Sequence, residues 1–169
     1  MRSAKESNGL LYWMTDTHWN KRGAYLAYAG FAKLVGVPAP EVSFTQGDPY
    51  RGDLIMISNQ PDFPLHVQDN WNLIWHTPPT WIETQIDGLQ NEAVSKPVIV
   101  NNPNALSDKY VWLLGDSFSV ALSPYFYATF QEVFFKGHWV DQLPNLPEEL
   151  RKAERKPDLI VIVRVERSF

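Results

Sequence analysis

The chain contains the stretch Tyr110-Val-Trp-Leu-Leu-Gly-Asp-Ser-Phe-Ser119, in which an apolar run ends in a Gly-Asp-Ser turn. The run predicts a buried strand over residues 110–114, and the residues that follow predict a helix over 118–130. A serine at such a junction projects its hydroxyl above the sheet edge, beside the first N–H groups of the helix. Ser117 is therefore a candidate nucleophile, although Asp116 or Ser117 could instead serve only as a helix cap.

The elements that follow this stretch alternate between strand and helix. Residues 133–135 predict a short strand, and residues 147–155 predict a helix with proline at its first position and acids before bases. The near-continuous β-branched residues of 159–165 predict a strand buried on both faces of a parallel sheet. This alternation predicts an α/β fold.

Upstream, residues 20–36 predict an amphipathic helix, because apolar residues recur at helical spacing and Gly36 and Pro38 provide the stop. From 38 to 103 the sequence is irregular, and proline and glycine around short apolar runs predict loops and short strands. Three tryptophans here are candidates for stacking on sugar rings or for core packing: Trp71, Trp75 and Trp81.

A second motif, Asp16-Thr-His18, lies just before the predicted helix at 20–36. A serine hydroxyl needs a base to accept its proton, and a carboxylate that fixes the tautomer of a histidine improves that base. Alternatively, Asp16 or Thr17 caps the helix and His18 is a surface residue, or Asp16 and His18 bind a metal. We expect no metal site, because no ligand spacing such as His-Glu-x-x-His is present and the other histidines (His66, His76 and His138) are scattered.

Composition narrows the class of protein. The 169 residues are enough for one domain, and 15 basic against 19 acidic residues give a net charge of −4, which argues against nucleic acid as a partner. The absence of cysteine excludes disulfides, zinc–thiolate sites, iron–sulfur clusters and cysteine nucleophiles. Aromatic residues make up 14% of the chain, a share that suits a sugar-binding surface as well as a core.

Together the motifs resemble those of the SGNH hydrolase-like polysaccharide O-acetyltransferases, specifically the periplasmic alginate O-acetyltransferase family. The aspartate and histidine precede the serine, as in the circularly permuted arrangement of these acetyltransferases. The likeness is carried, in the order that the family shows, by Asp16-Thr-His-Trp-Asn20 with Gly23-Ala24, Leu114-Gly-Asp-Ser-Phe-Ser119, Leu122-Ser-Pro-Tyr-Phe126 with Phe130, Lys156-Pro-Asp-Leu-Ile160 and Val165-Glu-Arg167.

The resemblance implies a three-layer SGNH hydrolase-like fold with a mainly parallel central sheet, formed by a single catalytic domain over residues 1–169. It implies Ser117 as nucleophile, His18 as general base and acid and Asp16 as orienting carboxylate, with no cofactor. Trp19, Tyr125 and Arg167 are weaker candidates for substrate contact. Trp19 could instead pack the helix entrance, Tyr125 could face the core, and Arg167 could be a charge at a strand end. Asn101 and Asn102 are candidates for the second oxyanion donor.

The implied activity moves an acetyl group through an acetyl-serine to hydroxyls of an exported polysaccharide such as alginate. The implied donor is supplied by a membrane-bound O-acyltransferase, and the implied compartment is the periplasm. Family members usually carry a signal or membrane anchor that this chain lacks, so we expect an excised or shortened catalytic domain. Two alternatives remain: a carbohydrate acetylesterase with the same triad, and a non-catalytic domain that binds polysaccharide or a partner protein.

Overall fold

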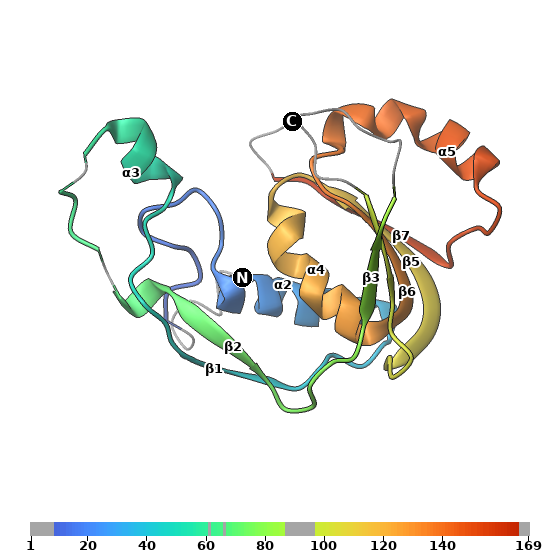
Figure 1. Cartoon of the computed structure of the whole chain (residues 1–169), viewed down its shortest axis with the longest axis horizontal. Helices are drawn as coiled ribbons and strands as arrows, with labels where there is room; N and C mark the ends of the chain where they lie inside the picture. Colours follow the sequence, from blue (N-terminus) through green and yellow to red (C-terminus); the bar gives the residue numbers. More distant parts are fainter. Residues whose placement is uncertain (1–8, 61, 66, 87–96, 166–169) are drawn as a thin grey trace. The chain divides into compact units, whose positions relative to one another are not determined.

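The computed structural model describes residues 9–60, 62–65, 67–86 and 97–165 (Figure 1). The chain divides into two compact units, one spanning Met1–Pro78 and the other Pro79–Phe169, here called the N-terminal and C-terminal units. None of the described helices is long and apolar enough to cross a membrane.

The N-terminal unit is built on a long helix and a two-stranded antiparallel sheet. Its elements are α2 (Lys21–Val35), β1 (Val42–Gln46), α3 (Asp53–Ser58), the 3₁₀ helix η2 (Val67–Asp69) and β2 (Trp71–Trp75). Strand β1 pairs with β2 from Val42 opposite Trp75 to Gln46 opposite Trp71, and β2 contacts α2.

Helix α2 confirms the helix predicted at 20–36. The side chain of Asn20 caps it by accepting a hydrogen bond from the main-chain N–H of Gly23. At the other end Gly36 adopts the left-handed conformation, with φ of 73°, and donates its N–H to the carbonyl of Ala32. The helix buries a narrow stripe of small and aromatic side chains at helical spacing: Ala24, Tyr28 and Ala32.

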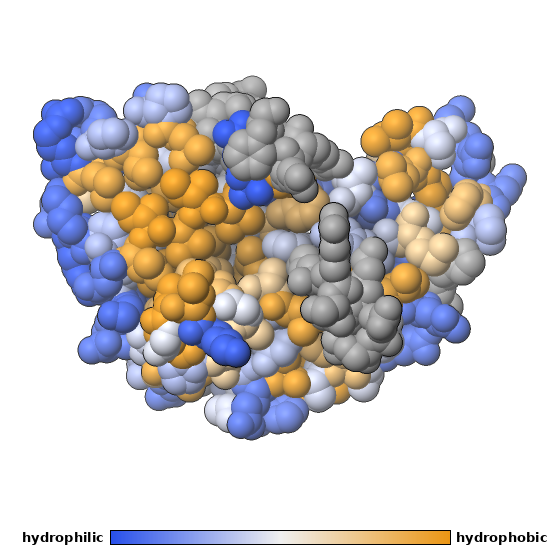
Figure 2. Space-filling view, turned by 180° about the vertical axis from the view of Figure 1, so that it is seen from behind, coloured by the Kyte–Doolittle hydropathy of each residue, from blue (hydrophilic) through white to orange (hydrophobic). Residues whose placement is uncertain are grey.

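The apolar run that begins at Leu54 forms helix α3, which corrects the prediction of loops and short strands there. Gly52 occupies the N-cap position, and Asn59 ends the helix in the left-handed conformation with its N–H directed to the carbonyls of Ile55 and Met56. Only Ile55 is buried, while Met56 and Ile57 are 78% and 77% exposed, and Figure 2 shows apolar atoms at the surface of this helix.

The C-terminal unit contains a five-stranded sheet with the strand order β3-β4-β6-β5-β7. Strand β5 runs parallel to both β6 and β7, whereas the pairs β3–β4 and β4–β6 are antiparallel. The α/β class is confirmed, but the sheet is mixed rather than mainly parallel. The elements are β3 (Ile82–Gln85), β4 (Val98–Asn101), β5 (Ser107–Gly115), α4 (Phe118–Thr129), β6 (Phe130–Lys136), η3 (Val140–Asn145), α5 (Leu146–Lys152) and β7 (Leu159–Val163).

Helices cover both faces of this sheet and give the unit three layers (Figure 1). Helix α4 contacts β5 and β6 on one face. On the other face, apolar side chains of η3 and α5 pack against a buried hydrophobic cluster formed by Tyr110, Trp112, Leu114, Phe134 and Trp139. This double coverage explains why β5 is a continuous apolar run.

Strand β7 is less buried than its β-branched sequence predicts. Among the described strands it pairs only with β5, so it forms an edge of the sheet. Its residues are half-buried, except that Ile162 is 46% exposed. The prediction of burial on both faces is therefore wrong, because the composition of a strand does not specify its place in the sheet order.

Asn20 is expected to be a large single contributor to the stability of the N-terminal unit. Its fully buried amide donates to the carbonyls of Leu10 and Asp69, both at 2.9 Å, in addition to capping α2. Asn20→Ala removes the cap and leaves two buried carbonyls without these donors, so urea unfolding followed by tryptophan fluorescence should show a loss of about 2–3 kcal/mol. The exposed Asn72→Ala is the control, with an expected change below about 0.5 kcal/mol; equal effects of the two substitutions would contradict the assignment.

Candidate active site

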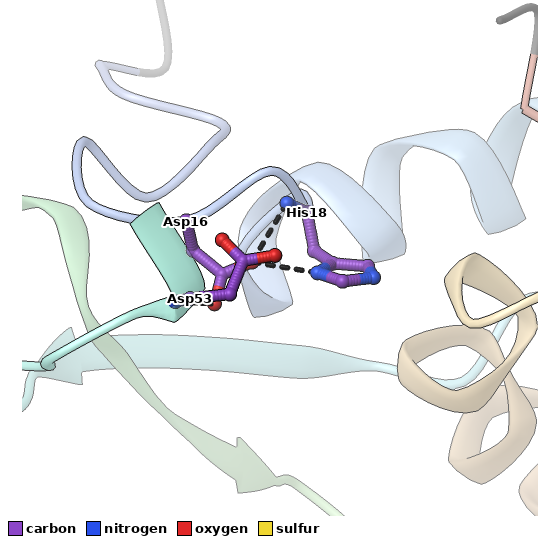
Figure 3. A group of neighbouring side chains, drawn as sticks. All are labelled: Asp16, His18 and Asp53. Atoms are coloured by element: carbon purple, nitrogen blue, oxygen red, sulfur yellow. Dashed lines mark hydrogen bonds and ion pairs between the residues drawn. The ribbon is translucent and has the colours of Figure 1, made fainter. Parts of the chain in front are cut away.

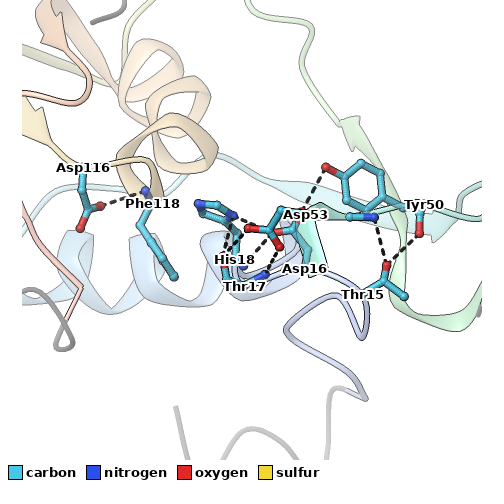
Figure 4. Close-up of polar contacts among 9 residues, drawn as sticks. Thr15, Asp16, Thr17, His18, Tyr50, Asp53, Asp116 and Phe118 are labelled. Carbon is cyan, nitrogen blue, oxygen red and sulfur yellow. Dashed lines mark hydrogen bonds and ion pairs between the residues drawn. The ribbon is translucent and has the colours of Figure 1, made fainter. Parts of the chain in front are cut away.

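Ser117 lies at the strand–helix turn that the sequence predicts, between the end of β5 and the start of α4. It occupies the N-cap position of α4, but its hydroxyl makes no capping hydrogen bond. The side chain of Asp116 caps the helix instead, because its Oδ1 accepts the main-chain N–H of Phe118 at 2.9 Å (Figure 4). The capping alternative therefore applies to Asp116, and the half-buried Ser117 hydroxyl is not needed for the helix.

The second carboxylate oxygen of Asp116 connects the turn to the end of β7. Oδ2 accepts the main-chain N–H of Val165 at 2.6 Å, and the Asp116 N–H donates to the carbonyl of Val163 at 3.1 Å. Gly115 allows this close approach, since a Cβ there would lie 2.7 Å from the Val163 carbonyl oxygen. Through Asp116, the turn that contains Ser117 is hydrogen-bonded to the start of α4 and to the residues at the end of β7.

Asp16 and His18 form the pair that the sequence predicts (Figure 3). Nδ1 of His18 lies 2.6 Å from Oδ1 of Asp16, and the same oxygen accepts the main-chain N–H of His18 at 2.9 Å. The Asp16 side chain is 5% exposed and the His18 side chain 27% exposed. An ionised Asp16 places the proton of a neutral His18 on Nδ1, so Nε2, which points away from the carboxylate, becomes the basic nitrogen.

The surroundings of Asp16 keep it ionised. Burial raises the pKa of Asp16, but hydrogen bonds from the His18 ring, the His18 main chain and the Asp53 main chain outweigh it and hold the pKa below its ordinary 3.8. Its Oδ2 accepts the Asp53 N–H at 3.2 Å and the Tyr50 hydroxyl at 3.3 Å. A buried carboxylate with four donors remains an anion at neutral pH.

Asp53 brings a second carboxylate to this pair. Among the described residues, Asp16, His18 and Asp53 form the one group with the composition of a metal site, with ligand atoms within 4.8 Å of one another. Each carboxylate oxygen already accepts a hydrogen bond, those of Asp53 from the N–H and hydroxyl of Thr17, and Nδ1 of His18 is engaged by Asp16. This arrangement fixes the orientation of the His18 ring.

The burial of two predicted substrate contacts favours packing roles. Tyr125 is 1% exposed within α4, so it faces the core, and the prediction that it contacts substrate is not supported. Trp19 is 9% exposed and its Cβ lies against Gly23, so it packs the entrance of α2. Arg167 lies outside the described residues.

The two asparagines suggested as oxyanion donors lie at the wrong end of the sheet. Asn101 is paired with Glu132, which is itself opposite Tyr110 near the start of β5, whereas Ser117 follows the end of β5. The buried Asn102 uses its amide to donate to the Tyr127 carbonyl at 2.9 Å. Neither residue lies at the end of β5 that leads to Ser117, so that prediction is wrong.

The three central tryptophans do not form one platform within either unit. Trp71 and Trp75 share the half-buried face of β2, and the guanidinium of Arg22 lies 4.3 Å from the Trp71 ring centre. Trp81 belongs to the C-terminal unit, where its indole N–H donates to Glu83 at 2.9 Å. These contacts favour packing over sugar stacking.

Sequence reasoning missed Tyr50, Gly52 and Asp53. The pair Gly52-Asp53 before an apolar run is a helix-start signal. Nothing local connects it to Asp16, which lies 37 residues earlier than Asp53. The structure therefore completes the Asp16–His18 pair within the N-terminal unit and the Ser117 turn within the C-terminal unit.

The chain is similar in fold to solved structures. A DHHW family protein from Eubacterium siraeum has a TM-score of 0.63 at 15% identity, covering 94% of this chain and 60% of that one. Bacillus cereus PatB1 with a sulfonyl adduct has a TM-score of 0.67 at 15% identity, covering 98% of this chain and 66% of that one. The O-acetyltransferase domain of Pseudomonas putida AlgJ has a TM-score of 0.49 at 17% identity, covering 95% of this chain and 54% of that one.

The first two structures share the fold of this chain, which agrees with the predicted α/β class. The chain spans less than two thirds of the length of these structures. No family model and no curated protein matches the sequence.

The lowered pKa of Asp16 predicts a pH-dependent contribution to stability. A group whose folded pKa lies below its unfolded value stabilises the fold above the unfolded pKa, near 3.8, and loses that contribution as pH falls through the folded pKa. Asp16→Asn should lower the free energy of unfolding by about 2 kcal/mol at pH 7 and by progressively less below pH about 4. The measurement is urea unfolding at pH 7 and at a pH below about 4, with the exposed Asp62→Asn as control. A deficit that stays constant or grows as pH falls would refute the assignment.

Proposed function

We propose that the chain is a serine-dependent O-acetyltransferase in which Ser117, His18 and Asp16 act as nucleophile, general base and orienting carboxylate. The observation that carries the proposal is the 2.6 Å contact between His18 Nδ1 and a buried Asp16 carboxylate that accepts three further hydrogen bonds. A surface histidine or a helix cap requires no such environment. The pairing sets the tautomer that makes Nε2 a base.

In the proposed reaction, Oγ of Ser117 attacks the acetyl carbonyl carbon while Nε2 of His18 takes the proton from the Ser117 hydroxyl. The Oγ–C bond forms and the carbonyl oxygen becomes an oxyanion beside the N-terminus of α4. When the oxyanion collapses, the bond to the donor alcohol breaks and His18 protonates the leaving oxygen. A sugar hydroxyl, deprotonated by His18, then attacks the acetyl carbonyl carbon. The bond from that carbon to Oγ breaks, and His18 returns the proton to Oγ of Ser117.

The polysaccharide acceptor, the acetyl donor and the compartment belong to the same proposal. The resemblance of the motifs to those of the alginate O-acetyltransferase family suggests an exported polysaccharide such as alginate as acceptor, in the periplasm, with acetyl supplied by a membrane-bound O-acyltransferase. The fold shared with PatB1, whose solved structure carries a sulfonyl adduct, supports nucleophile chemistry on this scaffold, because a sulfonyl group attaches to a nucleophilic side chain.

The first expected result is an acetyl-enzyme. Incubation with p-nitrophenyl acetate should increase the intact mass by one acetyl group, and peptide mapping should place it on Ser117. Ser117→Ala should abolish the adduct and lower kcat/KM for ester hydrolysis at least about a thousandfold, because the nucleophile is lost. The exposed Ser43→Ala is the matched control and should behave as the wild type.

A polysaccharide acceptor separates the alternatives. Transfer of acetyl to alginate or another polymer supports the transferase, whereas an adduct that only water discharges identifies an acetylesterase. Absence of the adduct, together with hydrolysis unchanged in Ser117→Ala, would refute catalysis and favour a non-catalytic binding domain.

A further inference from the structure

We propose that residues 50–53 form a positioning clamp for the catalytic pair, with Tyr50 and Asp53 as positioning residues that act through Asp16 and Thr17 (Figure 4). The inference rests on the proposed function, because the orientation of His18 matters to the reaction only if His18 is the base. All the contacts involved lie within the N-terminal unit.

The clamp holds the Asp16 oxygen that His18 does not use. Oδ1 is taken by the ring and main chain of His18, and Oδ2 accepts the Asp53 N–H at 3.2 Å and the Tyr50 hydroxyl at 3.3 Å. Rotation about the terminal bond of an aspartate is broad and only weakly restricted by itself. Fixing both oxygens stops that rotation and so fixes the direction in which Asp16 meets Nδ1.

The Asp53 carboxylate holds the residue between the two catalytic side chains. Its Oδ1 accepts the main-chain N–H of Thr17 at 2.9 Å, and its Oδ2 accepts the Thr17 hydroxyl at 2.7 Å. The Thr17 oxygen also lies 3.5 Å from Nδ1 of His18. Because Thr17 gives its hydroxyl proton to Asp53, it does not compete as a donor, and the Nδ1 proton is directed to Asp16.

Gly52 allows the clamp to lie against residues 15–17. A Cβ at this position would lie 2.2 Å from the carbonyl oxygen of Thr15 and 2.5 Å from Cβ of Asp16, both shorter than any tolerated contact. Thr15 completes the attachment, since its hydroxyl accepts the Gly52 N–H and donates to the Tyr50 carbonyl, each at 3.1 Å. Leu54 donates its N–H to the Thr15 carbonyl at 3.1 Å.

Tyr50 is held as a donor to Asp16. Its ring stacks on Trp13 with the ring centres 4.5 Å apart. Burial raises the pKa of Tyr50, and the negative charge of Asp16 raises it further, so the hydroxyl keeps its proton. The donor is therefore present throughout the pH range in which an imidazole base works.

Two substitutions test the clamp. Tyr50→Phe removes one donor to Asp16 and Asp53→Asn removes one carboxylate oxygen from Thr17, and each should lower kcat for p-nitrophenyl acetate about 10- to 100-fold with little change in KM. The ¹⁵N NMR spectrum of the neutral His18 ring should change from a single Nδ1–H tautomer to a mixture. Asp48→Asn, which removes an exposed carboxylate nearby, should change neither readout.

The NMR readout needs no substrate, so it separates the two proposals. A tautomer shift in both variants of a protein that lacks esterase activity would support the clamp and refute the catalytic role. Normal acetyl-enzyme formation together with an unchanged tautomer and kcat in both variants would refute the clamp and leave the proposed function intact. Tyr50→Phe removes a single oxygen atom, and circular dichroism verifies that each variant is folded before it is compared.

Discussion

A carboxylate taken out of water must be surrounded by donors, and Asp16 meets this demand with four hydrogen bonds. Two of these donors come from His18 and the others from Tyr50 and Asp53, so the same anion orients an imidazole and attaches the start of α3 to the entrance of α2. The geometry of the site and the packing of the N-terminal unit are therefore not separable. A change that neutralises Asp16 loosens both.

Asp116 solves a similar problem in the C-terminal unit. Its two oxygens accept main-chain N–H groups of Phe118 and Val165, which connects the start of α4 to the end of β7. Asp16 lies two residues before His18 and Asp116 lies next to Ser117. Both aspartates accept hydrogen bonds from main-chain N–H groups. The acids beside Ser117 and His18 are in this respect alike, although Asp16 also contacts the imidazole ring of His18.

Features that depend on near neighbours in the chain are predictable from the sequence. The caps at Asn20 and Gly36 and the turn before Ser117 each follow from local chemistry, and so does the pairing of Asp16 with a histidine two residues later. Features that depend on distant partners are not predictable in this way. Asn102 precedes β5 in the chain, and the register of β4 places it near the start of that strand, at the opposite end from Ser117. Asp53 gives only a helix-start signal, because its connection to residues 16 and 17 exists only in three dimensions.

The hydrogen bond between Asp116 and Val165 joins residues 49 positions apart, and this separation sets an order of assembly during synthesis. Every contact of the Asp16–His18 pair described above comes from residues 13 to 54, which leave the ribosome before β5 is made. The turn at Ser117 reaches its final form only after Val163 and Val165 have been added. A growing chain therefore completes the surroundings of His18 first and those of Ser117 last, after β7 has been translated.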